Sequence, residues 1–481
     1  MRHIFSRRAS VKRSATRPTS ALRALAISVL LAATSTDLAL ADQPSKPTTN
    51  DVTLDLTAAQ RRDDLIFLRD TWKPQDKSFN QTQTQKFNQL IADTLAHVDK
   101  LDAVSFWMAA SRAVALSGNG HTNIDADVPP LPTLPVELWW FRDGLYIIST
   151  NPKHADLLGA RVEALGNSSP EAALAAVAPY ICGNADRVRR ISPAYLGVPA
   201  LLHRVGITKS DTESRLTVRL GNGKTTKVSL TAEVPSPKWR DSPEYWEALI
   251  PTPAGAADRW PHVLDKVKSR PDIYQPRTNL SYHWVGDGHR VFYFRSNEIY
   301  GTDANPMSLQ MDLLKMMDAE FEPHRPHAVI VDLRLNSGGN FLNTILFAQA
   351  LPAFIAPGAK IMVLVSASTF SAAIVTAAMI REYAGASVMF LGTDMGDNDQ
   401  FYAEGGRVSL PNSKLGVRQS SGLHDWTNGC PDINRCFWAT AIWGPRAKIS
   451  LHPDFVIDPT YAEYAGGHDP VMEKALALAA P

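Results

Sequence analysis

Three short stretches of the sequence carry residues that could perform acyl transfer. Gly338 and Gly339 are adjacent in LNSGGN, Ser371 opens the helix-like stretch SAAIVTAAMI, and His121 lies in GNGHTN. A serine hydroxyl can attack a carbonyl carbon when a neighbouring base removes its proton, and histidine is the usual base. Backbone N–H groups of paired glycines and of a first helical turn can stabilise the negative charge that develops on the carbonyl oxygen.

The glycine pair and the serine each follow an apolar strand. AVIVDLR, residues 328–334, leads into the glycines, and IMVLVSA, residues 361–367, leads to Ser371. Continuous runs rich in Val and Ile predict strands buried on both faces of a sheet, and residues 342–354 are long enough for a crossover helix. We therefore expect a parallel, right-handed unit with both loops at the carboxyl ends of its strands, where ligands bind. A helix N-cap at Ser371 and a plain glycine turn are the simpler interpretation of these features alone.

The motifs add a family resemblance. DLRLNSGGN, followed by a strand and TFSAA, resembles the core of the tail-specific (carboxyl-terminal-processing) serine peptidases, the group that includes the tricorn core protease. Members carry D-L-R-x-N-x-G-G, and then a nucleophilic serine and a small residue at the head of a helix. The resemblance implies Ser371 as nucleophile, with the N–H groups of Gly339 and Ala372 as oxyanion donors. It also implies that Asp332 and Arg334 brace the loop and take no part in the chemistry.

The histidine segment matches the tricorn-like branch of the same family. That branch has a G-x-G-H-T segment after an amino-terminal helical region, and its histidine is the general base. Gly118, Gly120, His121 and Thr122 match, so the resemblance implies that His121 takes the proton of Ser371. Without the resemblance, a histidine where a helix turns into extended chain is more often a surface or capping residue.

The group that would orient the histidine stays open. Many relatives place a catalytic lysine in G-x-x-T-x-G-K, but this chain has GTDMGD, with the acidic Asp397 near that position. That difference disfavours a serine–lysine dyad, and the next lysine, Lys414, lies in an expected turn. A serine–histidine pair usually has a third, orienting group, a glutamate in the tricorn-like branch. Glu404 is one candidate, Asp394, Asp397 and Asp399 are others, and a solvated surface position is the alternative for each.

Two other histidines, His424 and His468, are rivals for the role of base, but neither lies in a matching motif. The three cysteines are too few for a disulfide scaffold. Cys430 and Cys436 could close one small loop in an oxidising compartment, whereas the apolar neighbours of Cys182 predict a packed thiol. We expect neither a metal nor an organic cofactor, and the zincin motif H-E-x-x-H is absent from the sequence.

The amino terminus dominates the charge balance. The 481 residues have a formal net charge of +1, but residues 1–41 hold seven Lys or Arg and one acid, so the rest carries −5. A nucleic-acid partner is therefore not expected, because phosphate binding needs a basic face. The apolar run ALRALAISVLLAA and the ALA before Asp42 indicate a secretory signal cleaved after Ala41. That run is short for a membrane span, so we expect an exported protein, periplasmic or secreted, without a stable membrane anchor.

The order of predicted elements divides the chain into five parts. They are a signal peptide (1–41), a helical region ending in GNGHTN (42–125), a β-hairpin and PDZ-like region (126–235), a linker (236–278) and a catalytic α/β domain (279–481). Thr57 is a predicted helix N-cap, and Asp143–Gly144 and GNGKTT predict hairpin turns. LLGARVEALGNSSPEAALAAV resembles the carboxylate-binding loop and helix of a PDZ module. The expected fold class is α/β, with a crotonase/ClpP-like core.

The sequence thus predicts an exported serine peptidase acting on peptide bonds of unfolded or extended proteins through a Ser371 acyl-enzyme. The alternative is a catalytically inactive relative that binds peptides or apolar ligands, since the family lysine is missing. An acyl-CoA enzyme fits poorly with a secretory signal, and the G-x-S-x-G of α/β-hydrolases does not occur. Neither the substrate preference nor the oligomeric state follows from the sequence.

Overall fold

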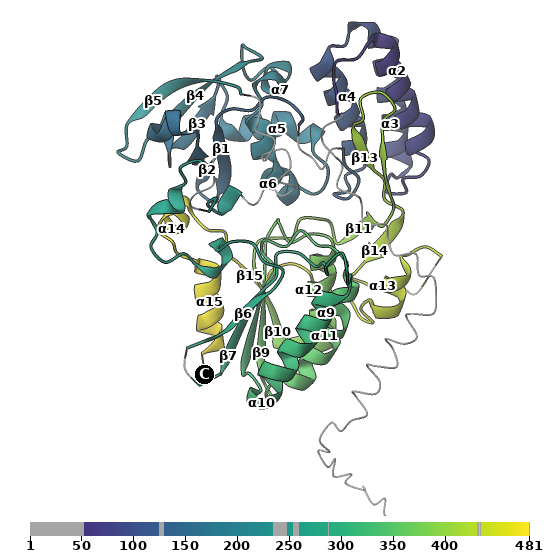
Figure 1. Ribbon diagram of the computed structural model, residues 1–481. Helices are drawn as coiled ribbons and strands as arrows, with labels where there is room; N and C mark the ends of the chain where they lie inside the picture. The colour runs from purple at the N-terminus through teal and green to yellow at the C-terminus, as the bar shows by residue number, and fades with distance from the viewer. Residues whose placement is uncertain are drawn as a thin grey trace, which may run out of the picture. The chain divides into compact units, whose positions relative to one another are not determined.

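The computed structural model describes residues 52–124, 129–233, 248–253, 259–286, 288–430, 432 and 434–480 (Figure 1). All of them belong to one compact unit, Lys46–Pro481. The predicted signal peptide and the first part of the predicted linker lie outside the described residues. Within the described ranges, no helix is both long and apolar enough to cross a membrane.

The chain begins with the helices that the sequence pattern predicts. Thr57 caps the first described helix and shares a capping box with Gln60, which satisfies two N–H groups of the first turn. Asn80 and Asp102 cap the next two helices through their side chains. The bounds are α2 Ala58–Phe67, a π-helical turn Leu68–Trp72, α3 Gln81–Ala96 and α4 Ala103–Ala115. The apolar sides of these helices pack around Trp72, Phe87 and Trp107, and GNGHTN follows the end of α4.

A five-stranded antiparallel sheet follows, and its strands pair in chain order. Both hairpins predicted from the sequence are present, because residues 142–143 and residues 220–224 each connect two paired strands. The strands are β1 Val136–Phe141, β2 Gly144–Thr150, β3 Arg161–Leu165, β4 Glu213–Arg219 and β5 Thr225–Thr231. Three helices lie between β3 and β4: α5 Pro170–Val177, α6 Ala185–Leu196 and α7 Pro199–Arg204.

The segment predicted as a linker is not an open connection where the structure describes it. Residues 263–266 and 272–274 form short 3-10 turns, and Val263, Leu264, Ile273 and Tyr274 are buried. They pack with Phe141 and with other apolar residues of one cluster. Because prolines and polar residues lie around these turns, the apolar residues show neither helical nor strand periodicity in the sequence.

The second large sheet has six strands in the order β15-β10-β9-β8-β7-β6. The edge strand β6 is antiparallel to β7, and the remaining neighbours are parallel. Their bounds are β6 Ser281–Val285, β7 Val291–Arg295, β8 Ala328–Asp332, β9 Lys360–Val365, β10 Val388–Gly392 and β15 Phe455–Val456. β8 and β9 are the two strands predicted from the sequence, and they are parallel and joined by a helix, as expected.

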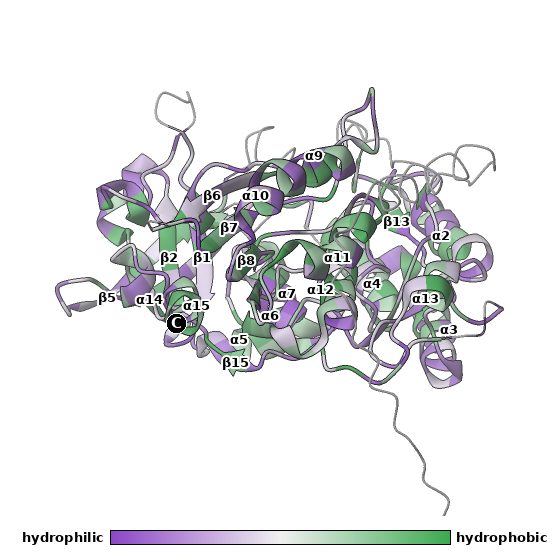
Figure 2. Ribbon diagram, turned by 90° about the horizontal axis from the view of Figure 1, so that it is seen from below, coloured by the Kyte–Doolittle hydropathy of each residue, from purple (hydrophilic) through white to green (hydrophobic). Residues whose placement is uncertain are grey.

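Helices cover both faces of this sheet (Figure 1). α9 Ser308–Met316, α11 Leu342–Phe354 and α12 Ala372–Ala384 pack on one face, and α15 Pro470–Ala479 packs on the other. The first nine residues of α12 are all buried, and α11 and α12 are largely hydrophobic (Figure 2). A helix that is apolar on several sides must be enclosed, so the backbone after Ser371 is held firmly.

Residues after β10 return to the amino-terminal helices. Here β11 Gln400–Ala403 pairs with β14 Gly422–Asp425, and β12 Arg407–Ser409 pairs with β13 Gly416–Arg418. The segment predicted to belong to one continuous catalytic domain therefore contributes Leu410, Leu415 and Val417 to the core of the amino-terminal region. α13 Trp438–Trp443 and α14 Tyr461–Ala465 follow. This return carries chain from beyond the serine to the histidine segment.

Candidate active site

Ser371 lies in the turn between β9 and α12, with backbone angles φ 54° and ψ −123°. Residues other than glycine rarely adopt a positive φ, and such strain persists only where the surroundings hold it. The preceding loop is tied to the chain after β8. The Ser366 hydroxyl donates to the carbonyl of Arg334 (2.5 Å), and the Thr369 hydroxyl donates to the carbonyl of Leu333 (2.8 Å). The serine is thus presented, half-buried, beside the glycine loop.

Neither glycine of the pair has room for a side chain, because Gly338 approaches Ser371 and Gly339 approaches Ile299. A Cβ on Gly338 would lie 2.5 Å from the Cβ of Ser371 and 2.9 Å from the nitrogen of Ala372. A Cβ on Gly339 would lie 2.3 Å from the carbonyl oxygen of Ile299. Both glycines also have positive φ, 104° and 135°, so the loop requires glycine for conformation and for space.

Two backbone N–H groups, one in the glycine loop and one directly after Ser371, have no hydrogen-bond partner among the described residues. Neither the N–H of Gly339 nor that of Ala372 donates to another residue of the described ranges. The N–H of Gly338, by contrast, donates to Oδ1 of Asn336 at 2.9 Å, which holds the loop in shape. Ala372 is the first residue of α12, where the helix dipole adds to the positive potential. These two groups have the chemistry of oxyanion donors.

His121 is 2% exposed and makes one polar contact through its ring. Its Nδ1 lies 3.0 Å from Oδ2 of Asp397. The carboxylate can only accept, so Nδ1 carries the proton and Nε2 is the basic atom. Nε2 is buried and has no hydrogen-bond partner among the described residues. Burial lowers the pKa of His121 to about 4, and the hydrogen bond and charge of Asp397 oppose that shift.

The ring of His121 stacks on the residue directly before the serine. Its centroid lies 4.2 Å from that of Phe370 and 5.2 Å from that of Phe401 in β11. Phe370 thereby brings the histidine segment to the turn that carries Ser371, although no hydrogen bond joins the hydroxyl to Nε2 in this structure. In enzymes without substrate such bonds are often long or open, and they tighten when substrate binds.

Asp397 is held by donors on its other oxygen. Oδ1 accepts the N–H groups of Asn398 at 2.9 Å and of Gly120 at 3.4 Å. Asn184 of α6 also donates to the carbonyl oxygen of Asp397 at 2.8 Å. The carboxylate therefore has little freedom to turn away from His121.

The other acids considered from the sequence lie elsewhere. Oε1 of Glu404 is 3.5 Å from Nε2 of His424, and Asp394 accepts from Nδ1 of His452 at 2.8 Å. Asp399 is 4.0 Å from Nε2 of His452. Asp397 is thus the one of these four acids that contacts His121, and no local pattern in the sequence distinguished it from the other three.

The remaining rivals also lie apart from this pair. Lys414 donates to the carbonyl of Pro411 within its turn, and exposed His468 lies 3.5 Å from Glu473. In the part of the chain that the structure describes, no group of three or more His, Cys, Asp or Glu residues could hold a metal ion.

A cavity of about 530 Å³ lies next to Asp397. Asp397 and Ile374, three residues after Ser371, form part of its wall. Its volume lies in the range of small-ligand pockets. Its lining is acidic, with Asp186, Asp394 and Asp399, and the hydrogen bond with Asp394 raises the pKa of His452.

Asp332 and Arg334 form buried ion pairs at the start of the loop that carries the glycines. Arg334 donates to both oxygens of Asp332 (2.9 and 2.6 Å) and to both oxygens of Asp469 (2.6 and 2.8 Å). Burial by itself would raise the pKa of Asp332, but the charge and hydrogen bonds of Arg334 outweigh it and lower that pKa. Because Asp469 caps α15, this buried cluster joins the β8 loop to the carboxyl-terminal helix.

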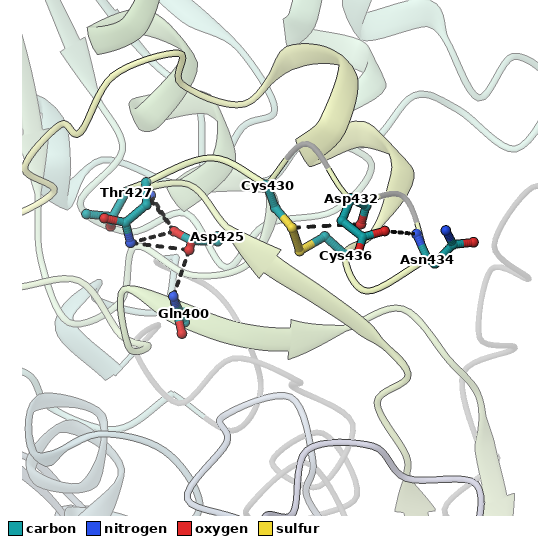
Figure 3. The surroundings of a disulfide bond; sticks show 8 residues. Gln400, Asp425, Thr427, Cys430, Asp432, Asn434 and Cys436 are labelled. Carbon is teal, nitrogen blue, oxygen red and sulfur yellow. Dashed lines mark hydrogen bonds between the residues drawn. A yellow bond between two sulfur atoms is a disulfide. The ribbon is translucent and has the colours of Figure 1, made fainter.

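The cysteines pair as the sequence suggested. Cys430 and Cys436 form a disulfide, with an S–S distance of 2.05 Å (Figure 3). Cys182 is buried and takes no part in that disulfide.

No family model matches the chain, and no curated protein does. Solved structures do match. Mature CPAF in complex with lactacystin has a TM-score of 0.51 and 13% identity over 88% of this chain and 98% of that chain. A point mutant of CPAF has a TM-score of 0.54 and 13% identity over 87% and 96%. The chain has the fold of CPAF. A photosystem II D1 C-terminal processing protease also matches, with a TM-score of 0.33 and 12% identity over 85% and 98%.

At these identities the likeness to CPAF is one of fold, and it covers most of the described residues. The α/β fold class predicted from the sequence is confirmed at that level. The roles of Ser371, His121, Gly339 and Ala372 stay predictions, supported by the geometry described above.

Proposed function

We propose that this protein is a serine peptidase of the tail-specific kind, which hydrolyses peptide bonds of unfolded or extended proteins. The observation that carries the proposal is the contact between His121 and Asp397. It leaves Nε2 basic and without a hydrogen-bond partner among the described residues, on a ring stacked against Phe370, the residue before the strained Ser371. A buried histidine whose only polar contact fixes its tautomer is the arrangement that a general base needs.

The reaction would be acyl transfer. Ser371 Oγ attacks the amide carbonyl carbon as its proton passes to Nε2 of His121, and the N–H groups of Gly339 and Ala372 stabilise the oxyanion. His121 then gives the proton to the leaving amine, and water clears the acyl-enzyme in the reverse sense. Asp397 keeps the proton of the neutral ring on Nδ1 and stabilises the imidazolium. Substrate binding must bring the hydroxyl within hydrogen-bond reach of Nε2.

The architecture supports a crotonase/ClpP-like core with a PDZ-like insert. Its oxyanion loop and its serine follow adjacent parallel strands, β8 and β9, at their carboxyl ends. The five-stranded meander, with α5 after β3, would be the PDZ-like module, which accepts an extended peptide by strand addition. We also propose export, cleavage near Ala41 and an oxidising compartment. The Cys430–Cys436 disulfide supports that location.

A second function is an inactive relative that binds peptides or apolar ligands. The observation that favours it is the open Ser371–His121 pair. The alternative gives no reason for the His121–Asp397 contact or for two free N–H groups beside the serine.

The deciding experiment compares the purified protein with its Ser371→Ala variant on a mixed library of unstructured peptides, read by mass spectrometry. Ser229→Ala, at an exposed position of β5, is the matched control. We expect cleavage by the wild type and the control but not by Ser371→Ala, and fluorophosphonate labelling of Ser371 alone. Cleavage by all three would remove Ser371 from the mechanism, and cleavage by none would favour the binding function.

A further inference from the structure

Five aromatic rings from five segments form a continuous column that includes the proposed base. Successive centroids lie 4.2, 5.2, 4.9 and 4.8 Å apart, and successive ring planes differ by 22°, 11°, 9° and 24°. The rings, in order, are Phe370, His121, Phe401, His424 and Phe437. His121 is therefore enclosed between the rings of Phe370 and Phe401.

The ring of His424 has a fixed orientation in this column. It is the direct cross-strand partner of Phe401 between β14 and β11. The indole N–H of Trp426 donates to its Nδ1 at 3.0 Å, so the ring proton is on Nε2, which faces Glu404. Double protonation or a ring flip would break the bond to Trp426, so the ring keeps one orientation.

Phe437 closes the column and belongs to the disulfide loop. It directly follows Cys436, and its N–H donates to the carbonyl of Leu423 at 2.8 Å. Its ring also meets the edge of Phe341, two residues after Gly339, with centroids 5.9 Å apart. Phe437 thus contacts both the column that encloses the base and the chain that follows the oxyanion loop.

The disulfide connects this loop to an ordered turn. Cys430 follows the turn at Asp425, whose carboxylate accepts from the N–H of Thr427 and from the side chain of Gln400 at 2.7 Å (Figure 3). The bond to Cys436 therefore ties the start of Phe437 to the end of β14. A covalent loop of this kind restricts the positions that its flanking residue can adopt.

We propose that the Cys430–Cys436 loop is a positioning element for catalysis, which places Phe437 against His424 and thereby fixes the orientation of His121. The kinetic part of this inference rests on the proposed peptidase function. Loss of the disulfide should allow the stacked rings to shift and the His121 ring to leave its position. A misplacement of about 1 Å can lower a catalytic rate about 100-fold.

The first test is the Cys430→Ser/Cys436→Ser double variant, with Cys182→Ala as the matched control. We expect kcat to fall by about 10- to 100-fold with KM nearly unchanged, because the loop orients the base and does not bind substrate. A dithiol reductant should have the same effect on the wild type. The disulfide gains two electrons and two protons to become two thiols, and the reductant becomes a disulfide. The reductant should not affect the double variant.

A second variant and a second readout cover the other outcomes. Phe437→Leu keeps the disulfide but removes the last ring of the column. It therefore tests the positioning role of the column if the double variant does not fold. The NMR titration of the His121 ring needs no activity, and its midpoint should rise towards the ordinary value in both variants. Unchanged kcat and an unchanged titration in a folded variant would overturn the proposal. A shifted titration in a protein without peptidase activity would instead refute the proposed function and leave the positioning role standing.

Discussion

Replacing Asp397 by asparagine should place the proton of His121 on the wrong nitrogen. Oδ1 of Asp397 accepts two backbone N–H groups, while Oδ2 accepts from Nδ1 of His121 at 3.0 Å. An asparagine at this position must point its single oxygen at the two backbone N–H groups, because an NH₂ group in that place is itself a donor and could not accept their hydrogen bonds. Its NH₂ group then faces the histidine, so Nδ1 has to accept and Nε2 has to carry the proton. A base protonated on Nε2 cannot take the proton of Ser371.

The magnitude follows from the lost tautomer. The corresponding change in a chymotrypsin-type triad lowers kcat about 10⁴-fold, and we expect about 10³- to 10⁴-fold here, or about 4 to 5.5 kcal/mol of barrier. KM should stay nearly constant because the substitution changes the protonation of the histidine ring and leaves the shape of the side chain almost unchanged. Asparagine has almost the same volume as aspartate, so the fold should survive.

The assay combines kcat and KM on a cleaved peptide with the ¹⁵N chemical shifts of the His121 ring, which report its tautomer. Asp63→Asn is the matched control, because that acid is exposed on α2. We expect the control to stay within about twofold of the wild type, as surface changes usually do. Near-normal kcat in Asp397→Asn, or an unchanged tautomer, would refute this reasoning.

Four further predictions test the rest of the site. Since burial lowers the pKa of His121 to about 4, kcat/KM should fall only as the pH drops through about 4, and an acid limb near 6.5 in the pH–rate profile would contradict this. Because of the same shift, the folded protein binds fewer protons than the unfolded chain between pH 4 and pH 6.5. The free energy of unfolding should therefore decrease as the pH falls from 6.5 to 4, as denaturant titrations can show. Gly338→Ala should abolish turnover, because its Cβ would meet Ser371. Gly358→Ala, also at positive φ but in open space, should lower the free energy of unfolding by only about 1 to 2 kcal/mol. Equal losses of turnover in the two variants would argue against the close approach of Gly338 to Ser371. Arg334→Met should leave two buried carboxylates unpaired and lower the free energy of unfolding by about 3 to 5 kcal/mol, and an unchanged midpoint of thermal unfolding would show that the cluster is not a support.

The local features of this protein were readable from its sequence. The cap at Thr57, the turn at Asp143–Gly144 and the two apolar strands before the glycines and the serine depend on residues that are neighbours in the chain. Their turn chemistry and periodicity are local physical properties, so each element forms where its pattern lies. The parallel pairing of β8 with β9 followed from the helix-length segment between them.

Only the tertiary structure decided which residues meet across the site. His121 and Asp397 are 276 residues apart, and neither carries a local signal for the other. The acid that reaches the histidine could not be separated from Glu404, Asp394 or Asp399, because all four lie in one stretch of loop and short strand. The choice depends on how β11 and β14 fold back onto the amino-terminal helices, which is set by packing and by hydrogen bonds between distant segments. Such contacts form only when the whole chain is folded, so a single sequence cannot rank them.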